Sequence, residues 1–204
     1  DIEDLEAQFD AGSEQIAVLN EIRSAKGDAS VVIVATIEAL AQSAPDPKTL
    51  ADLQIELKVG TDYGFDGLLK DLKRLDYDHE GLCEAPGQFA KRGGLIDVYP
   101  ITADKPYRVD FFGDEIESIK TLDPVSQRSG ESVPTIALTA SPRMEIKKAK
   151  NGILDYLETS VAWALVEPES LVENLDRYSP DGAERIEGEF WNGLRASRSN
   201  QRDT

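Results

Sequence analysis

The chain has 204 residues, of which 40% are hydrophobic and 30% charged, a composition typical of a globular protein and not of a disordered one. Its formal net charge is −17, from 39 acidic and 22 basic side chains, and a mainly acidic surface would repel the phosphates of nucleic acid. The single cysteine, Cys83, excludes an intrachain disulfide and a cysteine-based zinc cluster, and no apolar run approaches the ~20 residues needed to span a bilayer.

The first sixty residues predict part of an α/β layer. Ser13 is a candidate N-cap for a helix that runs to about residue 25, because apolar residues recur every three positions after it. The unbroken apolar run at 31–35 is typical of a strand buried on both faces of a mostly parallel sheet. Residues 36–42 and 48–53 predict short helices on either side of a break at Pro45-Asp46-Pro47.

The middle of the chain has a different pattern. Residues 55–59 alternate apolar and polar side chains, which predicts a half-buried strand ending at Gly60. A helix is expected from Phe65 to Leu75, followed by a strand candidate at 77–84. The stretch 86–123 then holds extended runs, turn signals and several cations in an otherwise acidic chain.

The last part returns to an α/β pattern. We expect a helix at 145–157, a second buried strand at 161–166, and helices at 168–178 and 183–194. The polar tail at 197–204 is expected to fray.

Together these elements predict an α/β fold in which a partial layer is split around an inserted domain. The apolar runs at 31–35 and 161–166 would be strands of one layer, contributed by residues 1–60 and 142–204. Residues 61–141 would form the insert, an α+β domain with an antiparallel hairpin sheet. Because Met144 is the only methionine, we expect the chain to be a piece of a longer protein.

The clearest hairpin signal is Gly113-Asp114. A two-residue loop there pairs Phe112 with Glu115, Phe111 with Ile116, Asp110 with Glu117 and Val109 with Ser118.

Alternation along this strand divides its side chains between two faces. Tyr107, Val109 and Phe111 form a core face, and Arg108, Asp110 and Phe112 share the other. An arginine beside a large aromatic is typical of a protein-binding surface. The alternative is that Phe112 folds over the turn or packs under a neighbouring helix, and that Arg108 pairs only with Asp110.

One residue does not fit this register. Ile119 falls opposite Arg108 on the polar face, so either a bulge shifts the register or that face is partly covered.

No catalytic, cofactor or metal site is expected. The phosphate-binding pattern Gly-x-x-x-x-Gly-Lys-Ser/Thr does not occur, and the glycines of Lys91-Arg92-Gly93-Gly94 favour a bulge or a close backbone approach in a strand. His79 is the only histidine, and it and Cys83 are interpreted as structural residues. Acidic pairs such as Asp114 with Glu115 are interpreted as solvated.

Two motifs carry a family resemblance. Residues 87–100, Gly-Gln-Phe-Ala-Lys-Arg-Gly-Gly-Leu-Ile-Asp-Val-Tyr-Pro, and 108–119, Arg-Val-Asp-Phe-Phe-Gly-Asp-Glu-Ile-Glu-Ser-Ile, resemble the UvrB-homology module. Two bacterial families carry this module, the repair protein UvrB and the transcription-repair coupling factor Mfd. The continuation at 123–129 and the flanks at 33–47 and 153–168 are more similar to the coupling factor.

This resemblance implies a fold and a function. The module is a degenerate RecA-like domain, without a nucleotide site, split around a UvrA-binding insert. The implied function is recruitment of the excision-repair protein UvrA to a stalled RNA polymerase in the bacterial cytoplasm, with the ATP-driven motor outside this segment. No direct contact with nucleic acid or membrane is expected.

The resemblance also implies site residues. The family's UvrA contacts match Arg92, Arg108 and Phe112 in this chain. In the full-length family member, the protein's own C-terminal domain masks the same face.

Two alternatives remain open. The chain is a segment of a UvrB-like helicase and ATPase, or it is a structural insert whose arginine and phenylalanine face packs only inside its own protein.

Overall fold

The structure is a computed structural model that describes residues 2–25, 32–142, 151–157 and 166. The chain divides into two compact units, and each is described by itself. Unit 1 contains residues 1–18 and 48–145, and unit 2 contains residues 19–47 and 146–204. Among the described residues, no helix has the length and apolar character that a membrane crossing requires.

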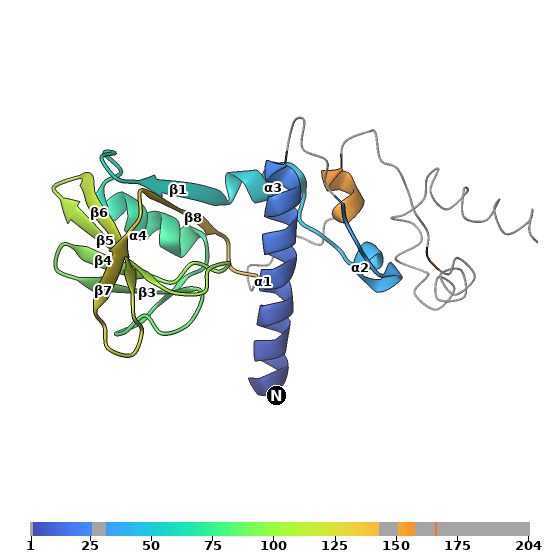
Figure 1. Cartoon of the computed structure of the whole chain (residues 1–204), viewed down its shortest axis with the longest axis horizontal. Helices are drawn as coiled ribbons and strands as arrows, with labels where there is room; N and C mark the ends of the chain where they lie inside the picture. The colour runs from blue at the N-terminus through green and yellow to red at the C-terminus, as the bar shows by residue number, and fades with distance from the viewer. Residues whose placement is uncertain (1, 26–31, 143–150, 158–165, 167–204) are drawn as a thin grey trace, which may run out of the picture. The chain divides into compact units, whose positions relative to one another are not determined.

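Unit 1 is built on a six-stranded sheet (Figure 1). The strand order is β2-β3-β4-β5-β6-β7, antiparallel throughout except for the parallel pair β2 and β3. The strands are β2 (Asp78–His79), β3 (Gln88–Arg92), β4 (Leu95–Val98), β5 (Tyr107–Phe112), β6 (Glu115–Leu122) and β7 (Ser129–Ser132). The antiparallel sheet predicted for the inserted domain is therefore present, while the strand expected at 77–84 is only two residues long.

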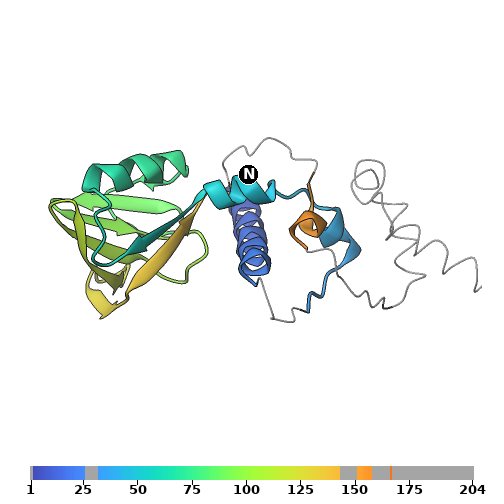
Figure 2. The same ribbon diagram turned by 90° about the horizontal axis from the view of Figure 1, so that it is seen from above.

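Helix α4 (Phe65–Arg74) lies along one face of this sheet (Figure 2). Leu68 and Leu72 are one helical turn apart and fully buried, so the apolar stripe of the helix faces the sheet. At its first turn the Phe65 ring meets Phe111 of β5 edge-on, with 5.5 Å between the ring centroids. The helix expected from Phe65 to Leu75 is confirmed.

A second, two-stranded ladder joins segments far apart in the sequence. Strand β1 (Gln54–Lys58) pairs antiparallel with β8 (Thr135–Thr139), and α3 (Pro47–Asp52) precedes β1. The ladder extends by one bond beyond the strands, because the Ala140 amide donates to Leu53 O, and the next amide, that of Ser141, donates to Leu75 O at the C-terminal end of α4. This pairing brings together the two ends of the segment between residues 58 and 135, which contains α4 and the six-stranded sheet. The half-buried strand expected at 55–59 is confirmed.

The hairpin of β5 and β6 follows the predicted register only near its turn. Phe112 pairs with Glu115 and Phe111 with Ile116, as predicted. A bulge between Asp110 and Phe111 then shifts the ladder, so that Asp110 pairs with Ser118 and not with Glu117. The predicted pairing of Val109 with Ser118 is wrong in the same way.

The bulge removes the conflict at Ile119. Val109 pairs with Ile119, Arg108 with Lys120, and Ile119 is buried on the core face. Of the two explanations, the shifted register is therefore the one that the structure has.

The glycines after Arg92 form a turn and not a bulge. Arg92 pairs directly with Leu95, and Gly93 takes a φ of +60° in the two-residue connection between β3 and β4. A close backbone approach is also present, since the Phe111 amide donates to Gly94 O.

The first helix is longer than predicted. Helix α1 runs over Ile2–Ser24, so Ser13 lies inside it and not at its N-cap. The Ser13 hydroxyl donates to Phe9 O, one turn earlier, which is a common way for a helical serine to satisfy its side chain. The helical spacing was correctly interpreted, but the starting residue was wrong.

The apolar run after α1 does not form the predicted strand. In its described part, residues 32–35, the backbone is irregular, and Val32 and Val34 are 88% and 94% exposed. A strand buried on both faces needs partner strands, and the described residues of unit 2 supply only an isolated bridge between Ala44 and Asn151. The RecA-like layer therefore stays a prediction.

The other described elements of unit 2 are short. They are α2 (Ile37–Ala41), which Thr36 caps through its side chain, and the 3₁₀ turn η1 (Ile153–Tyr156). Tyr156 is buried and donates to Pro45 O at 2.8 Å. The helix expected at 145–157 is a 3₁₀ turn where it is described, and Val166 is an exposed bend residue.

The remaining predictions for the C-terminal part, at 161–165, 168–178, 183–194 and 197–204, lie outside the described residues. The boundaries near Gly60 and Pro142 stay predictions.

Candidate protein-docking surface

The sheet of unit 1 has one face covered by α4 and another that carries the predicted site residues. On β5, Val109 and Phe111 are buried on the α4 side, while Phe112 is 79% exposed on the other. The alternation predicted for this strand is therefore confirmed. We call the face that carries Arg92, Arg108 and Phe112 the arginine face.

Asp97 of β4 lies at the centre of the arginine face and is fully buried. It stands directly opposite Arg108 in the ladder of β4 and β5. Arg108 forms a bidentate ion pair with Asp97, in which Nε donates to Oδ1 at 2.7 Å and Nη2 donates to Oδ2 at 2.8 Å. This hydrogen bonding to Asp97 is the main cause that raises the pKa of Arg108. The alternative that paired Arg108 with Asp110 alone is wrong, because the bidentate partner comes from another strand.

Arg92 of β3 approaches the same carboxylate diagonally. Its Nε lies 3.9 Å from Asp97 Oδ2, and its side chain is 39% exposed. The side chain of Arg108, by contrast, is only 17% exposed. The structure thus brings Arg92 and Arg108 together on one buried carboxylate.

A loop between β6 and β7 joins both arginines. Arg92 Nη2 donates to Gln127 Oε1 at 3.1 Å, and Arg108 Nη1 lies 3.5 Å from Gln127 O and 3.4 Å from Ser129 Oγ. The loop is braced by its own bonds, since the Ser126 amide donates to Asp123 Oδ1 and Gln127 Nε2 to Pro124 O. These bonds hold the loop against the arginines.

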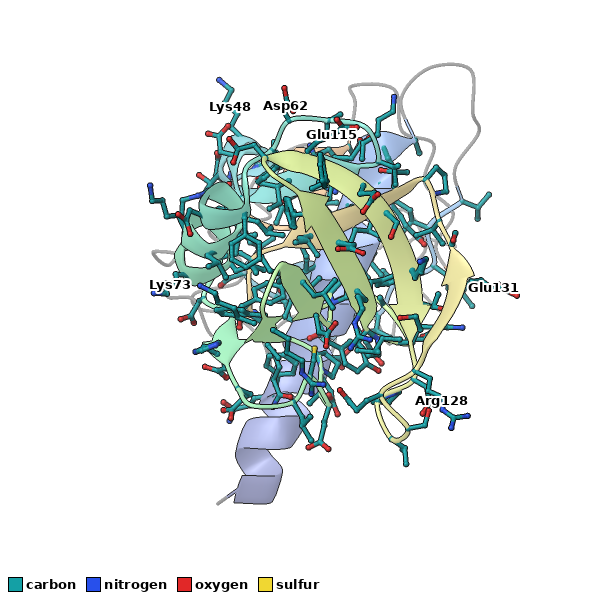
Figure 3. The ribbon with its side chains drawn as sticks, turned by 90° about the vertical axis from the view of Figure 1, so that its left-hand side faces the viewer. Lys48, Asp62, Lys73, Glu115, Arg128 and Glu131 are labelled. Atoms are coloured by element: carbon teal, nitrogen blue, oxygen red, sulfur yellow. The ribbon has the colours of Figure 1, made fainter. Side chains whose placement is uncertain are left out.

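Phe112 lies at the far end of the arginine face, next to the turn. Figure 3 shows Glu115, its partner across the ladder, at the start of β6, and Arg128 on the loop that follows β6, toward the opposite end of the sheet. Arg108 and Phe112 are four positions apart along the strand, a distance of roughly 13 Å between their backbones. The three predicted contact residues therefore share one face, with the arginines clustered and the phenylalanine apart from them.

Asp97 and Gln127 are functional candidates that the sequence reasoning missed. A signal was present for Asp97, because a carboxylate between Ile96 and Val98 in a strand needs a cationic partner if it is buried. Gln127 had no comparable signal, since its contacts arise only when the loop folds back over the sheet.

His79 and Cys83, interpreted above as structural residues, have different surroundings. His79 is exposed, with its ring 4.9 Å from that of Phe89. Cys83 is fully buried, and burial raises the pKa of its thiol to about 12. In the part of the chain that the structure describes, no group of three His, Cys, Asp or Glu side chains could hold a metal ion.

Comparison with known proteins identifies the segment that carries this face. Residues 55–143 match the family described as the UvrB interaction domain. The transcription-repair-coupling factor of Myxococcus xanthus is 31% identical over an alignment of 170 residues that covers 79% of this chain and 14% of that protein. That of Bacillus subtilis (strain 168) is 29% identical over 154 residues, 75% of this chain and 13% of the relative.

A UvrB protein is similar to the same degree. The UvrABC system protein B of Thermosipho africanus (strain TCF52B) is 29% identical over 150 residues, 71% of this chain and 22% of that protein. The chain thus spans between 13% and 22% of the length of these relatives. The arginine face lies wholly within residues 55–143, the segment that matches the UvrB interaction domain, and the similar proteins include both transcription-repair-coupling factors and a UvrB protein.

Proposed function

We propose that this chain is a non-catalytic docking module of a bacterial transcription-repair coupling factor that binds UvrA and so recruits it to a stalled RNA polymerase. The observation that carries the proposal is the exposed Phe112, 79% accessible, on the same face as an arginine pair anchored by a buried carboxylate. Large aromatics and arginines dominate the binding energy of protein interfaces.

The matched family supports a protein-binding role, and the resemblance of the motifs around Arg92, Arg108 and Phe112 supports UvrA as the partner. Masking of this face by a C-terminal domain of the longer protein belongs to the same proposal. A chain without that domain would then bind UvrA constitutively.

The experiment is a titration of UvrA with this chain, followed by calorimetry or size-exclusion co-elution. Phe112→Ala is expected to weaken binding by about 2 kcal/mol or more, roughly thirtyfold, because it removes an apolar anchor. Val32→Ala is the matched control, since Val32 is an equally exposed apolar residue in the other unit.

Arg92→Ala is expected to weaken binding as well, with Lys73→Ala, an exposed cation on α4, as its control. A wild-type chain that does not bind UvrA, or a Phe112→Ala variant that binds as tightly as wild type, would disprove the docking proposal.

The second candidate is a segment of a UvrB-like ATPase, which the similarity to a UvrB protein favours. We propose that this chain itself has no enzymatic activity, since its sequence holds no phosphate-binding loop. ATP turnover by the purified chain above the background of a mock preparation would support the ATPase candidate instead.

A further inference from the structure

We infer that Asp97, Arg108 and Gln127 are positioning residues, and that Arg92 is the arginine that binds the partner, through a carboxylate of an Asp or Glu side chain. This inference rests on the proposed docking function and assigns different roles to residues that the resemblance treats alike. The partner surface would then offer a carboxylate to Arg92 and an apolar site to Phe112.

The hydrogen-bonding capacity of Arg108 is nearly used up inside the domain. A guanidinium has five N–H donors. Arg108 directs two of its bonds to Asp97, one to Gln127 O and one to Ser129 Oγ. With its side chain only 17% exposed, Arg108 has little left to offer a partner.

Arg92 is arranged differently. Its one hydrogen bond in the described part of the chain runs to Gln127 Oε1, and its Nε lies 3.9 Å from Asp97 Oδ2, beyond hydrogen-bond range. Its side chain is 39% exposed. Arg92 therefore keeps donors that face solvent while its position is fixed from two sides.

The charges of the cluster select the chemistry of the ligand. Among Asp97, Arg92 and Arg108, one positive charge remains after the carboxylate is balanced. The carboxylate of Asp110, which shares this face, interacts electrostatically with Arg108, so the excess positive charge lies at Arg92. Arginine binds a carboxylate in a planar, bidentate fashion. A carboxylate would complete the cluster, whereas a second cation would be repelled by it.

The backbone of Gln127 gives independent support. Its φ is +58°, in the left-handed region that residues other than glycine seldom adopt. Such a conformation is retained where surrounding contacts fix it, and it often marks a functional position. Here it aims the carbonyl of Gln127 at Arg108 and its side-chain amide at Arg92 and Pro124.

The first test is Gln127→Gly, measured for stability and for affinity. Glycine adopts the same φ without strain but removes the amide that holds Arg92. We expect an unchanged or higher melting temperature together with an affinity for UvrA about threefold lower, a modest loss because this bond positions Arg92 and does not itself join the partner. A purely structural residue would lower both quantities together. Unchanged affinity would overturn the role of Gln127.

The second test is a double-mutant cycle on the affinity for UvrA. Asp97→Asn and Arg108→Lys, each confirmed as folded by circular dichroism, are expected to weaken binding about tenfold in the wild-type background. In an Arg92→Ala background, the same changes are expected to have little further effect, because they act through Arg92. Arg92→Lys serves as the background if the Arg92→Ala complex is too weak to titrate.

The outcomes separate this inference from the docking proposal. Binding by the wild-type chain, with Arg108→Lys weakening it equally in both backgrounds, makes Arg108 a direct contact and overturns the inference alone. No binding by the wild-type chain rejects the docking proposal itself.

A partner carboxylate is tested by Arg92→Glu, which is expected to abolish binding and to be partly rescued by a UvrA variant with Lys at the facing Asp or Glu.

Discussion

At the residue scale, the domain depends on the pairing of one buried carboxylate. Asp97 is fully buried and reaches no solvent, and within the described part of the chain its ion-pair partners are Arg108 and Arg92. Burying a charge without a partner costs several kcal/mol, whereas an exposed ion pair contributes little. The loss of Arg108 should therefore affect stability as well as docking.

We predict that Arg108→Ala lowers the free energy of unfolding by about 3 kcal/mol, near the lower end of the range for a broken buried pair because Arg108 keeps some access to water. Urea denaturation measures the change. The control is Arg74→Ala, which removes the exposed pair with Asp71 at 3.0 Å and should cost less than about 1 kcal/mol. Equal effects of the two substitutions would show that the burial of Asp97 does not matter.

Cys83 provides a probe of folding at the same scale. Its side chain is fully buried, and burial raises the pKa of the thiol to about 12. Because the thiolate is the reactive form, we predict that Cys83 resists a thiol reagent at pH 8 in the folded chain and reacts rapidly in denaturant. The raised pKa means that the thiol stays protonated until the pH approaches that value.

The measurement is the rate of colour release from a disulfide reagent. A Cys83→Ser/Glu80→Cys variant, whose single thiol replaces an exposed residue, is the control and should react quickly without denaturant. Fast labelling of the native wild-type chain would mean that the region around Cys83 opens readily.

At the scale of elements, the sequence pattern correctly predicted those helices and turns that depend on neighbouring residues alone. Helix α4 was predicted correctly from the spacing of Phe65, Leu68 and Leu72. The end of the hairpin was predicted correctly from the turn signal at Gly113-Asp114. The bulge had only an indirect signal. Ile116 and Ile119 are both buried, yet they are three residues apart, so strict alternation cannot place both on one face. The assignment of Ile119 to the polar face under strict alternation was therefore the signal in the sequence that a bulge was present.

Burial was predicted less well where it depends on distant segments. The run 31–35 was interpreted as a buried strand, but Val32 and Val34 are exposed. An apolar run shows that a segment can be buried and not which strands will pair with it. Ser13 failed for a related reason, because an N-cap depends on where the preceding chain stops being helical.

The turn of the β5–β6 hairpin gives a prediction at this scale. Gly113 has a φ of +64°, and a Cβ added there would meet no atom within 4 Å. Gly113→Ala should therefore destabilise the domain by about 1 kcal/mol through backbone strain alone. Thermal unfolding measures the shift.

Gly81→Ala is the matched control, since a Cβ at Gly81 also meets no atom within 4 Å and its backbone is not in the left-handed region. That change should leave stability equal or slightly higher. If both substitutions behave alike, the turn conformation is not what Gly113 provides.

At the scale of the whole molecule, the candidate surface was predicted in part. Alternation along β5 placed Arg108 and Phe112 on one face, which needs only the strand itself. The anchor Asp97 comes from β4 and the brace Gln127 from the loop after β6, so their meeting depends on strand order. Sequence patterns do not contain that order, and the division of roles between Arg92 and Arg108 follows only from the assembled sheet.

Charge gives the last prediction at this scale. The chain carries a net charge of −17, and Asp110, Glu115 and Glu117 lie on the strands that present the arginine face. Binding to DNA depends mainly on neutralising phosphates and is strongest at low salt. We predict that the chain does not bind duplex DNA even at low salt.

Fluorescence anisotropy of a labelled duplex titrated with the chain measures this directly, with a basic DNA-binding protein as the positive control. Saturable binding that weakens as salt is added would contradict the prediction. In that event Arg92→Ala decides what the cluster is for. If the substitution abolishes DNA binding, phosphate replaces carboxylate as the ligand of Arg92, and if it has no effect, the DNA is bound elsewhere on the chain.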